Sequence, residues 1–270
     1  MKKQVKYEIK KFSPIRQILS DFNDEAASMP HVLGLLEIDV TDARRIIKEV
    51  QEREGLKLSF TGWIAKCIGD AVKENKRLNS FLKGRSKIII FENVDISIMI
   101  EIKNEKGQEI PYNHIIRKIE TKNIREITEE IRSVQNRKIE GKDQVRGRSS
   151  IALKIYSFVP KFIRRMIMKI LLRNPFYIQK TAGTVGLTTV GMFIKKVGGW
   201  AIPYAIKTLS VAVAGIKEKP AIVDDKIEKR DIANVTFLVD HNLVDGAPST
   251  RFIARVVDLM ESAYGLEEFV

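Results

Sequence analysis

Helix-like and strand-like patterns alternate along this chain without a strict β–α–β repeat, and this alternation limits its possible folds more than any other feature. The first helix is predicted over 13–30, with Ser13 as the N-cap and Pro14 in the first turn. No internal repeat is visible, so an α/β (α+β) fold in a single domain is the simplest interpretation. Further helices are predicted over 41–55, capped by Thr41 or Asp42, and over 59–75, 121–138 and about 247–264; strands are predicted over 31–40, in short pieces over 78–102, and over 183–193, 207–216, 221–231 and 234–240, with turns at 104–107 and 218–220.

Two basic segments stand out from this pattern. Residues 1–11 form a basic N-terminal segment, and the domain that follows is expected to run over 12–270. A segment at about 150–179 then combines long aliphatic side chains with lysines and arginines and contains no acidic residue from 151 to 179. Such an insert either lies on an anionic membrane surface or packs on its own fold with basic side chains reaching outward, and the second is favoured.

The net charge of +13 suits anionic partners, which include nucleic acid, acidic lipid and phosphorylated small molecules. The chain has no zinc-finger spacing, aromatic RNA-binding signature or Walker-type glycine loop, so no nucleic-acid partner is predicted. His31 and His114 lack ligand-like neighbours at suitable spacings, so no metal site is predicted either. The lone Cys67 lies in an apolar helical pattern and is interpreted as core packing.

No apolar stretch of signal-peptide length follows the N-terminus, so the cytoplasm is the expected location. The weakly charged run over 197–216 has the length of a membrane span, but Lys207, Pro203 and paired glycines interrupt it. Buried strands are the favoured interpretation of this run.

His241 is the strongest candidate for chemistry. It follows a strand-like run and precedes Asp245 and Gly246, where a helix-like pattern begins and Gly246 is expected to supply a tight turn. An imidazole at such a strand end can take a proton from a thiol or hydroxyl as that group attacks a carbonyl. From the residues alone, His241 is either a general base or a turn residue, and Asp245 either orients it or serves as a structural carboxylate.

The motif and four further segments resemble the catalytic domain of dihydrolipoamide acyltransferases, the core subunits of 2-oxo-acid dehydrogenase complexes. These share their fold and a His-x-x-x-Asp-Gly motif with chloramphenicol acetyltransferase. The resemblance covers most of 12–268. It rests on the arginine at Arg16, a Pro-His followed by a strand over 29–44, the helix over 57–80, the strand over 183–193 and the motif itself over 240–261.

This resemblance implies a coenzyme A-dependent acyltransferase with a mixed sheet flanked by helices, assembled as a trimer with active sites between subunits. His241 would be the general base, Thr188 would hydrogen-bond the oxyanion, and Asp245 would form an internal salt bridge with Arg16. Coenzyme A is the implied substrate, and dihydrolipoamide, free or on a separate carrier protein, is the implied acceptor. No metal is implied, the residues that bind coenzyme A are not assigned, and assembly beyond the trimer is left open.

The chain also departs from the family pattern. Asn242 replaces the arginine that usually follows the histidine, and Gly186 stands where a threonine is common, so an altered pocket is expected. No lipoyl domain is recognised ahead of residue 12, so a lipoyl group is expected only on a partner. Two alternatives therefore stay open: the same chemistry on another small acceptor, and a catalytically silent scaffold or regulatory relative.

Overall fold

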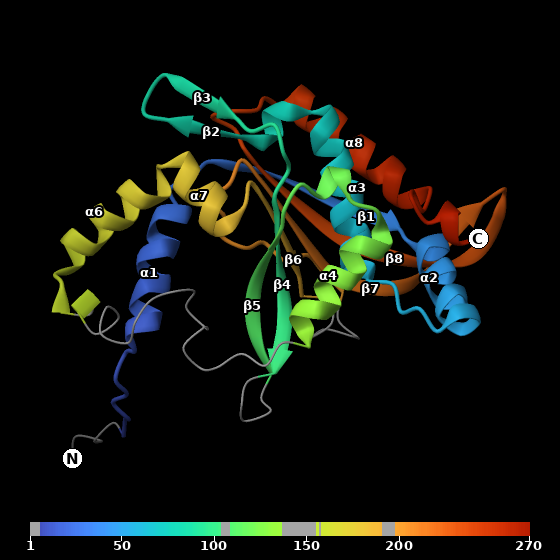
Figure 1. The fold of residues 1–270 in the computed structure, drawn as a ribbon, viewed down its shortest axis with the longest axis horizontal. Coiled ribbons are helices and arrows are strands. Elements are labelled where there is room, and N and C mark those ends of the chain that lie inside the picture. Colours follow the sequence, from blue (N-terminus) through green and yellow to red (C-terminus); the bar gives the residue numbers. More distant parts are fainter. Residues whose placement is uncertain (1–5, 104–108, 137–154, 157, 191–197) are drawn as a thin grey trace, which may run out of the picture.

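The computed structural model describes residues 6–103, 109–136, 155–156, 158–190 and 198–270. Within them, a mixed sheet of six strands in the order β1-β8-β7-β6-β4-β5 forms the centre, and β2 and β3 form a separate hairpin (Figure 1). The strands are β1 (His31–Asp39), β2 (Ser80–Lys83), β3 (Lys87–Ile90), β4 (Ile96–Lys103), β5 (Glu109–Ile116), β6 (Val185–Thr189), β7 (Leu209–Val223) and β8 (Lys226–Asp240). The α-helices are α1 (Pro14–Ala26), α2 (Thr41–Glu54), α3 (Phe60–Glu74), α4 (Ile124–Gln135), α6 (Lys161–Leu172), α7 (Pro175–Ala182) and α8 (Gly246–Glu261), with short 3₁₀ turns at Lys76–Asn79, Ile119–Thr121 and Glu267–Phe269.

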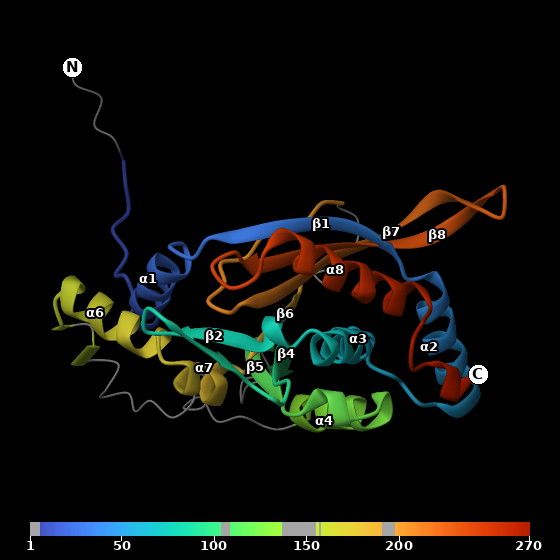
Figure 2. The same cartoon turned by 90° about the horizontal axis from the view of Figure 1, so that it is seen from above.

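One face of the sheet is covered by α3, α4 and α8; α3 packs against both α4 and α8, which in turn pack on β4 and β1 (Figure 2). Ile96, Ile98 and Ile100 of β4 are buried, as are Trp63 of α3 and Phe252 of α8. Successive side chains of a strand point to opposite faces, so the alternation in β4 assigns its isoleucines to this core. The predicted α/β (α+β) class, a mixed sheet flanked by helices, is confirmed.

The opposite face carries a row of small and polar side chains. Ser97 and Met99 of β4, Gly186 and Thr188 of β6, and Ser210 of β7 occupy the positions that alternate with the core residues. Gly186 pairs with both Ser97 and Ser210 across parallel strands, so these three positions lie side by side. This face is where a ligand can meet the sheet.

Local signals placed most element ends correctly. The Ser13 hydroxyl accepts a hydrogen bond from the Arg16 amide at 3.3 Å, which confirms the predicted cap of α1. In α2, the N-cap position is Val40, without a side-chain cap, so the predicted cap at Thr41 or Asp42 is wrong. Thr41 is instead the first helical residue, and its amide donates to the Asp39 carboxylate at 2.9 Å.

The long hairpin of β7 and β8 extends beyond the rest of the sheet (Figure 2). A turn was predicted at 218–220, but Pro220 lies inside β7 and pairs with Lys229. Only the first part of β7 pairs with β6, so Pro220 lies on an open edge, where a missing amide hydrogen costs no ladder bond. The turn falls at Asp224 and Asp225, which both adopt positive φ, as a two-residue hairpin turn requires.

The predicted basic insert contributes α6, which packs on α1 (Figure 1). Arg164 is nearly buried, and its Nε lies 3.1 Å from the Asp21 carboxylate, which also accepts a hydrogen bond from the Tyr156 hydroxyl at 2.8 Å. Lys161 and Arg165 approach Asp24 at 3.5 and 3.7 Å. The expectation that the basic side chains reach outward is therefore wrong for Arg164, which turns inward to Asp21 of α1. Lys161 and Arg165 stay mostly exposed, as expected.

Replacing Asp21 with alanine is expected to destabilise the protein by about 3–5 kcal/mol, because it leaves the Arg164 guanidinium buried without its carboxylate. Urea unfolding at neutral pH measures this change. Asp24→Ala is the matched control, since its ion pairs are largely exposed and should cost at most ~1 kcal/mol. Equal, small losses for both variants would contradict the buried pair.

Within the described residues, no helix is both long and apolar enough to cross a membrane. The second half of the run over 197–216 is buried strand in β7, as predicted, from Leu209 onward. Cys67 is fully buried in α3, and burial raises the pKa of its thiol, which confirms core packing. The predicted turn at 104–107 and the end of the strand predicted over 183–193 lie outside the described residues, apart from the part assigned to β6.

Candidate functional site

His241 lies immediately after β8, in the loop that leads into α8. Its amide donates to the Pro30 carbonyl at 3.0 Å, which ties the loop to the start of β1. The Asp240 carbonyl accepts from the amides of Leu243 and Val244, both at 3.1 Å, so the loop turns tightly. The His241 side chain is exposed, and in the part of the chain that the structure describes its ring makes no hydrogen bond. The backbone is thus fixed while the imidazole stays accessible.

Asp245 and Gly246 play smaller parts than expected. Asp245 occupies the N-cap position of α8, but its side chain makes no capping hydrogen bond. Gly246 is the first residue of α8, its φ is not positive, and a Cβ there would meet no atom within 4 Å. The prediction that Gly246 supplies a tight turn is therefore wrong, because the turn is made by Asp240 and the residues that bond to it.

Arg16 and Asp245 do not form the expected internal salt bridge. Both are exposed, and neither makes an ion pair within the described part of this chain. Arg16 lies in the first turn of α1, which packs on α6, whereas Asp245 lies at the start of α8 (Figure 1). The buried pair that was predicted is absent from the single chain because these two helices begin at separate places in the fold.

A cavity of about 630 Å³ adjoins the His241 loop. Asp240, Asn242 and Leu243 line it on the loop side. The β2–β3 hairpin contributes Arg85, and the end of α6 contributes Arg173, whose guanidinium lies 3.5 Å from Glu25. The cavity is therefore polar where it meets the loop, and its far walls carry Arg85 together with the pair of Arg173 and Glu25.

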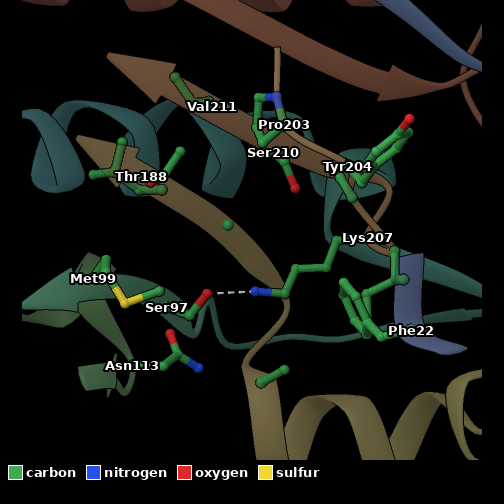
Figure 3. Close-up of a pocket in the computed structure, with 15 residues that line it drawn as sticks. Phe22, Ser97, Met99, Asn113, Thr188, Pro203, Tyr204, Lys207, Ser210 and Val211 are labelled. Carbon is green, nitrogen blue, oxygen red and sulfur yellow. Dashed lines mark hydrogen bonds between the residues drawn. The ribbon is translucent and has the colours of Figure 1, made fainter. Parts of the chain in front are cut away.

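Thr188 lines a different cavity, of about 350 Å³, on the open face of the sheet. Figure 3 shows Thr188, Met99, Asn113 and Ser97 along one side of this cavity, with Lys207 reaching across it toward Ser97. Small apolar groups and a few polar ones alternate on its walls, which is typical of a site for a small organic ligand. Phe22 of α1 closes one end.

Lys207 was not predicted as a site residue. It is 6% exposed, and its ammonium donates to the Ser97 hydroxyl and, at 3.1 Å, to the Val185 carbonyl. Burial lowers the pKa of this lysine to about 7. Its sequence signal is a single cation inside the apolar run over 197–216, which argues against a membrane span but does not by itself indicate a binding residue.

The single chain does not bring His241 and Thr188 together. Thr188 and Thr236 both pair with Ala212, so they lie in one row of the sheet, two strands apart. His241 lies five residues beyond Thr236 along β8. At about 3.3 Å per residue and about 4.8 Å per strand, the two candidate residues are roughly 20 Å apart. Of these two cavities, the smaller is lined by Thr188, and the larger is lined by the neighbours of His241 in its loop.

No group of three metal-binding side chains occurs among the residues that the structure describes. His31 donates from Nε2 to the Lys207 carbonyl at 3.0 Å, and His114 contacts Glu130 at 2.7 Å. Both of these histidines thus have structural partners, and His241 is the one whose ring is left accessible.

The sequence matches the family model described as "2-oxoacid dehydrogenases acyltransferase (catalytic domain)" over residues 4–148 and 179–267. Both Thr188 and His241 lie within the matched residues. The gap in the match, 149–178, coincides with the basic segment that interrupts the domain pattern.

Among curated relatives, the chain is 25% identical over 257 residues to the lipoamide acyltransferase component of the branched-chain alpha-keto acid dehydrogenase complex of Bacillus subtilis (92% of this chain, 50% of the relative). It is 23% identical over 251 residues to the mitochondrial dihydrolipoyllysine-residue succinyltransferase component of the 2-oxoglutarate dehydrogenase complex of Saccharomyces cerevisiae (92% of this chain, 45% of the relative). The chain therefore spans about half the length of these relatives.

Among solved structures, a probable dihydrolipoamide acetyltransferase from Listeria monocytogenes aligns with a TM-score of 0.69 at 22% identity, over 96% of each chain. The dihydrolipoamide acetyltransferase of Azotobacter vinelandii, studied for one serine, one histidine and one asparagine in its catalytic mechanism, aligns with a TM-score of 0.67 at 19% identity (95% of this chain, 92% of that one). These structures share the fold. Because the family model spans most of the chain, the protein belongs to the 2-oxoacid dehydrogenase acyltransferase (catalytic domain) family.

Proposed function

We propose that this protein is an acyltransferase that moves an acyl group between coenzyme A and a thiol acceptor, with dihydrolipoamide as the acceptor, free or on a separate carrier protein. The observation that carries this proposal is the family match across both Thr188 and His241. The accessible imidazole on a fixed backbone adds support, since a base must reach the proton it removes.

In the proposed reaction, a nitrogen of the His241 ring takes the proton from the acceptor thiol. The sulfur then attacks the thioester carbonyl carbon, and the carbonyl oxygen gains the negative charge of a tetrahedral intermediate. The Thr188 hydroxyl donates a hydrogen bond to that oxygen, an interaction that typically lowers the barrier by about 3–4 kcal/mol. Collapse of the intermediate breaks the bond to the coenzyme A sulfur, which takes the proton back from His241.

We infer that the active unit is a homotrimer in which one chain supplies His241 and its neighbour supplies Thr188. The separation of roughly 20 Å within one chain, from the strand spacings, supports this arrangement. So does the edge strand β1, whose Val32, Leu33 and Leu35 are exposed in the single chain. An apolar sheet edge of this kind is usually covered by another chain. A trimer assembled into a larger core is compatible with the same surfaces.

We place the protein in the cytoplasm and propose that the lipoyl group, where one is used, is carried by a separate partner protein. The basic residues of α6 support packing on α1 rather than membrane binding as their main role, because Asp21 and Asp24 neutralise several of them. Arg85 and Arg173 beside the His241 loop are suitable contacts for an anionic substrate such as coenzyme A. Nucleic acid is not proposed as a partner.

Mass-spectrometric detection of acyl transfer tests this function directly. Wild-type protein, with a trimeric mass confirmed by light scattering, is mixed with acetyl-, butanoyl- and succinyl-coenzyme A and with dihydrolipoamide. Acylated dihydrolipoamide is the expected product with at least one donor. A folded trimer that binds coenzyme A and gives no product would reject dihydrolipoamide as the acceptor. A folded protein that binds no coenzyme A would favour the silent scaffold.

A further inference from the structure

Lys207 is a buried cation with only neutral partners. Its two hydrogen bonds go to the Ser97 hydroxyl and the Val185 carbonyl, and no carboxylate forms an ion pair with it among the described residues. An ammonium has three N–H donors, so one remains for a ligand. A lysine in such a place normally binds an anion or loses its proton.

The position of Lys207 makes a ligand accessible to it. The side chain lines the cavity that also contains Thr188, and its ammonium contacts Ser97 of β4 and Val185 of β6, the strands that also carry Met99 and Thr188 (Figure 3). The other titratable side chain on the described walls is Tyr204, which is largely exposed, and His31 contacts only the Lys207 backbone. Lys207 is therefore the one buried charge available to a ligand in this cavity.

Gly186 keeps the space beside Lys207 open. A Cβ at this position would lie 2.8 Å from the Ser210 hydroxyl oxygen and 3.6 Å from the Lys207 ammonium nitrogen. A larger side chain at this position would fill the space that borders the cation. The absent side chain and the buried lysine together make a small pocket with a positive end.

The distance between this pocket and Thr188 suits a short chain. Thr188 lies two residues beyond Gly186 on β6, which is about 6.6 Å along the strand. An acyl carbonyl beside the Thr188 hydroxyl would direct its chain past Met99 toward Lys207. A short chain that ends in a carboxylate spans this distance and meets the free N–H.

We propose that Lys207, with Ser97 beside it, binds the terminal carboxylate of a short dicarboxylic acyl group, so that this enzyme selects an anionic acyl group over an uncharged one of the same length. This inference rests on the proposed acyl transfer and adds the substrate class. Lys207 would be a specificity residue, and His241 and Thr188 would keep their roles.

The test compares succinyl-coenzyme A with butanoyl-coenzyme A, which have the same chain length and differ in a terminal carboxylate or methyl group. At pH 6.5 the wild type is expected to favour succinyl in kcat/KM by about ten- to hundred-fold, the usual effect of one hydrogen bond to a charged group. Lys207→Met should lower kcat/KM for succinyl more than for butanoyl, so that the ratio of the two falls to about one or below. Lys180→Met, which removes an exposed lysine from α7, is the matched control and should keep the wild-type ratio.

The outcomes separate the two proposals. Transfer of butanoyl without a succinyl preference, or the same ratio in Lys207→Met as in wild type, would overturn the role of Lys207 and leave the acyltransferase intact. If neither donor is used, the anion site is tested by calorimetric titration of succinyl-coenzyme A at pH 8. Two buffers of different ionisation enthalpy give the number of protons that the protein takes up on binding. Proton uptake on binding that disappears in Lys207→Met would support the anion site, and unchanged uptake would reject it.

Discussion

Replacing His241 with alanine is expected to lower the rate of acyl transfer by about 10²–10⁴-fold, the usual contribution of a positioned general base. The loss arises because the thiol then has no group to take its proton. His241 is exposed and its ring has no hydrogen-bond partner among the described residues, so the protein should keep its stability and its oligomeric mass. The measurement is the initial rate of acylated product by mass spectrometry, with folding checked by thermal unfolding.

His114→Ala is the matched control for this experiment. It removes a histidine of the same chain whose ring contacts Glu130, away from both cavities. Its rate should stay close to that of the wild type. A rate in His241→Ala within a factor of a few of the wild type would show that the imidazole is not the base.

Lys207→Met is expected to stabilise the protein at low pH by several kcal/mol. Burial lowers the pKa of Lys207 from 10.5 to about 7 in the folded protein, whereas the unfolded lysine titrates near 10.5. The unfolded chain therefore holds more protons between these values, and the free energy of unfolding of the wild type rises with pH across this window. At about 1.4 kcal/mol per pKa unit, the buried ammonium destabilises the wild type by on the order of 5 kcal/mol. This destabilisation is fully present below pH 7 and is lost as the pH approaches 10.5.

The methionine variant cannot titrate at this position, so it should lack this part of the pH dependence. Urea unfolding without substrate at pH 6 and pH 9 measures the free energy of unfolding of both proteins. The variant should be more stable than the wild type by a large margin at pH 6 and by a smaller margin at pH 9. Lys180→Met should follow the wild-type profile at both values. Parallel profiles for Lys207→Met and wild type would mean that the buried lysine keeps its ordinary pKa.

Local signals in the sequence predicted much of the fold. The helix start at Ser13 and Pro14 depends on neighbouring residues alone, and the structure shows it as predicted. The turn near Pro220 was misplaced because proline normally interrupts a strand, and only the sheet order shows that β7 has an open edge there. The residues around Pro220 do not show whether β7 has a neighbouring strand on that side, because strand order depends on distant parts of the chain.

The candidate site was predicted less completely, because it depends on contacts between distant segments. The motif at His241 marks a loop that the structure fixes by a bond to Pro30, but Arg16 and Asp245 prove to be separate in the single chain. Lys207 lies 110 residues from Ser97 in sequence, so its burial between β4 and β6 could not be seen in the pattern. Gly186 departs from the expected family pattern, and in the structure its lack of a side chain leaves space beside that lysine.

Mixed trimers of His241→Ala and Thr188→Ala chains test the central claim, which is acyl transfer at a site shared by two subunits. Each variant alone should be nearly inactive, since each lacks one of the two groups at every site. Chains carrying different affinity tags are unfolded, mixed in equal amounts and refolded, and the mixed trimers are isolated through both tags. If neighbouring chains supply the two groups, every trimer that contains both variants has one intact site among its three, and the isolated mixed trimers should regain about a third of wild-type activity. Mixed trimers with no more activity than the separate variants would contradict a site built from His241 of one chain and Thr188 of its neighbour.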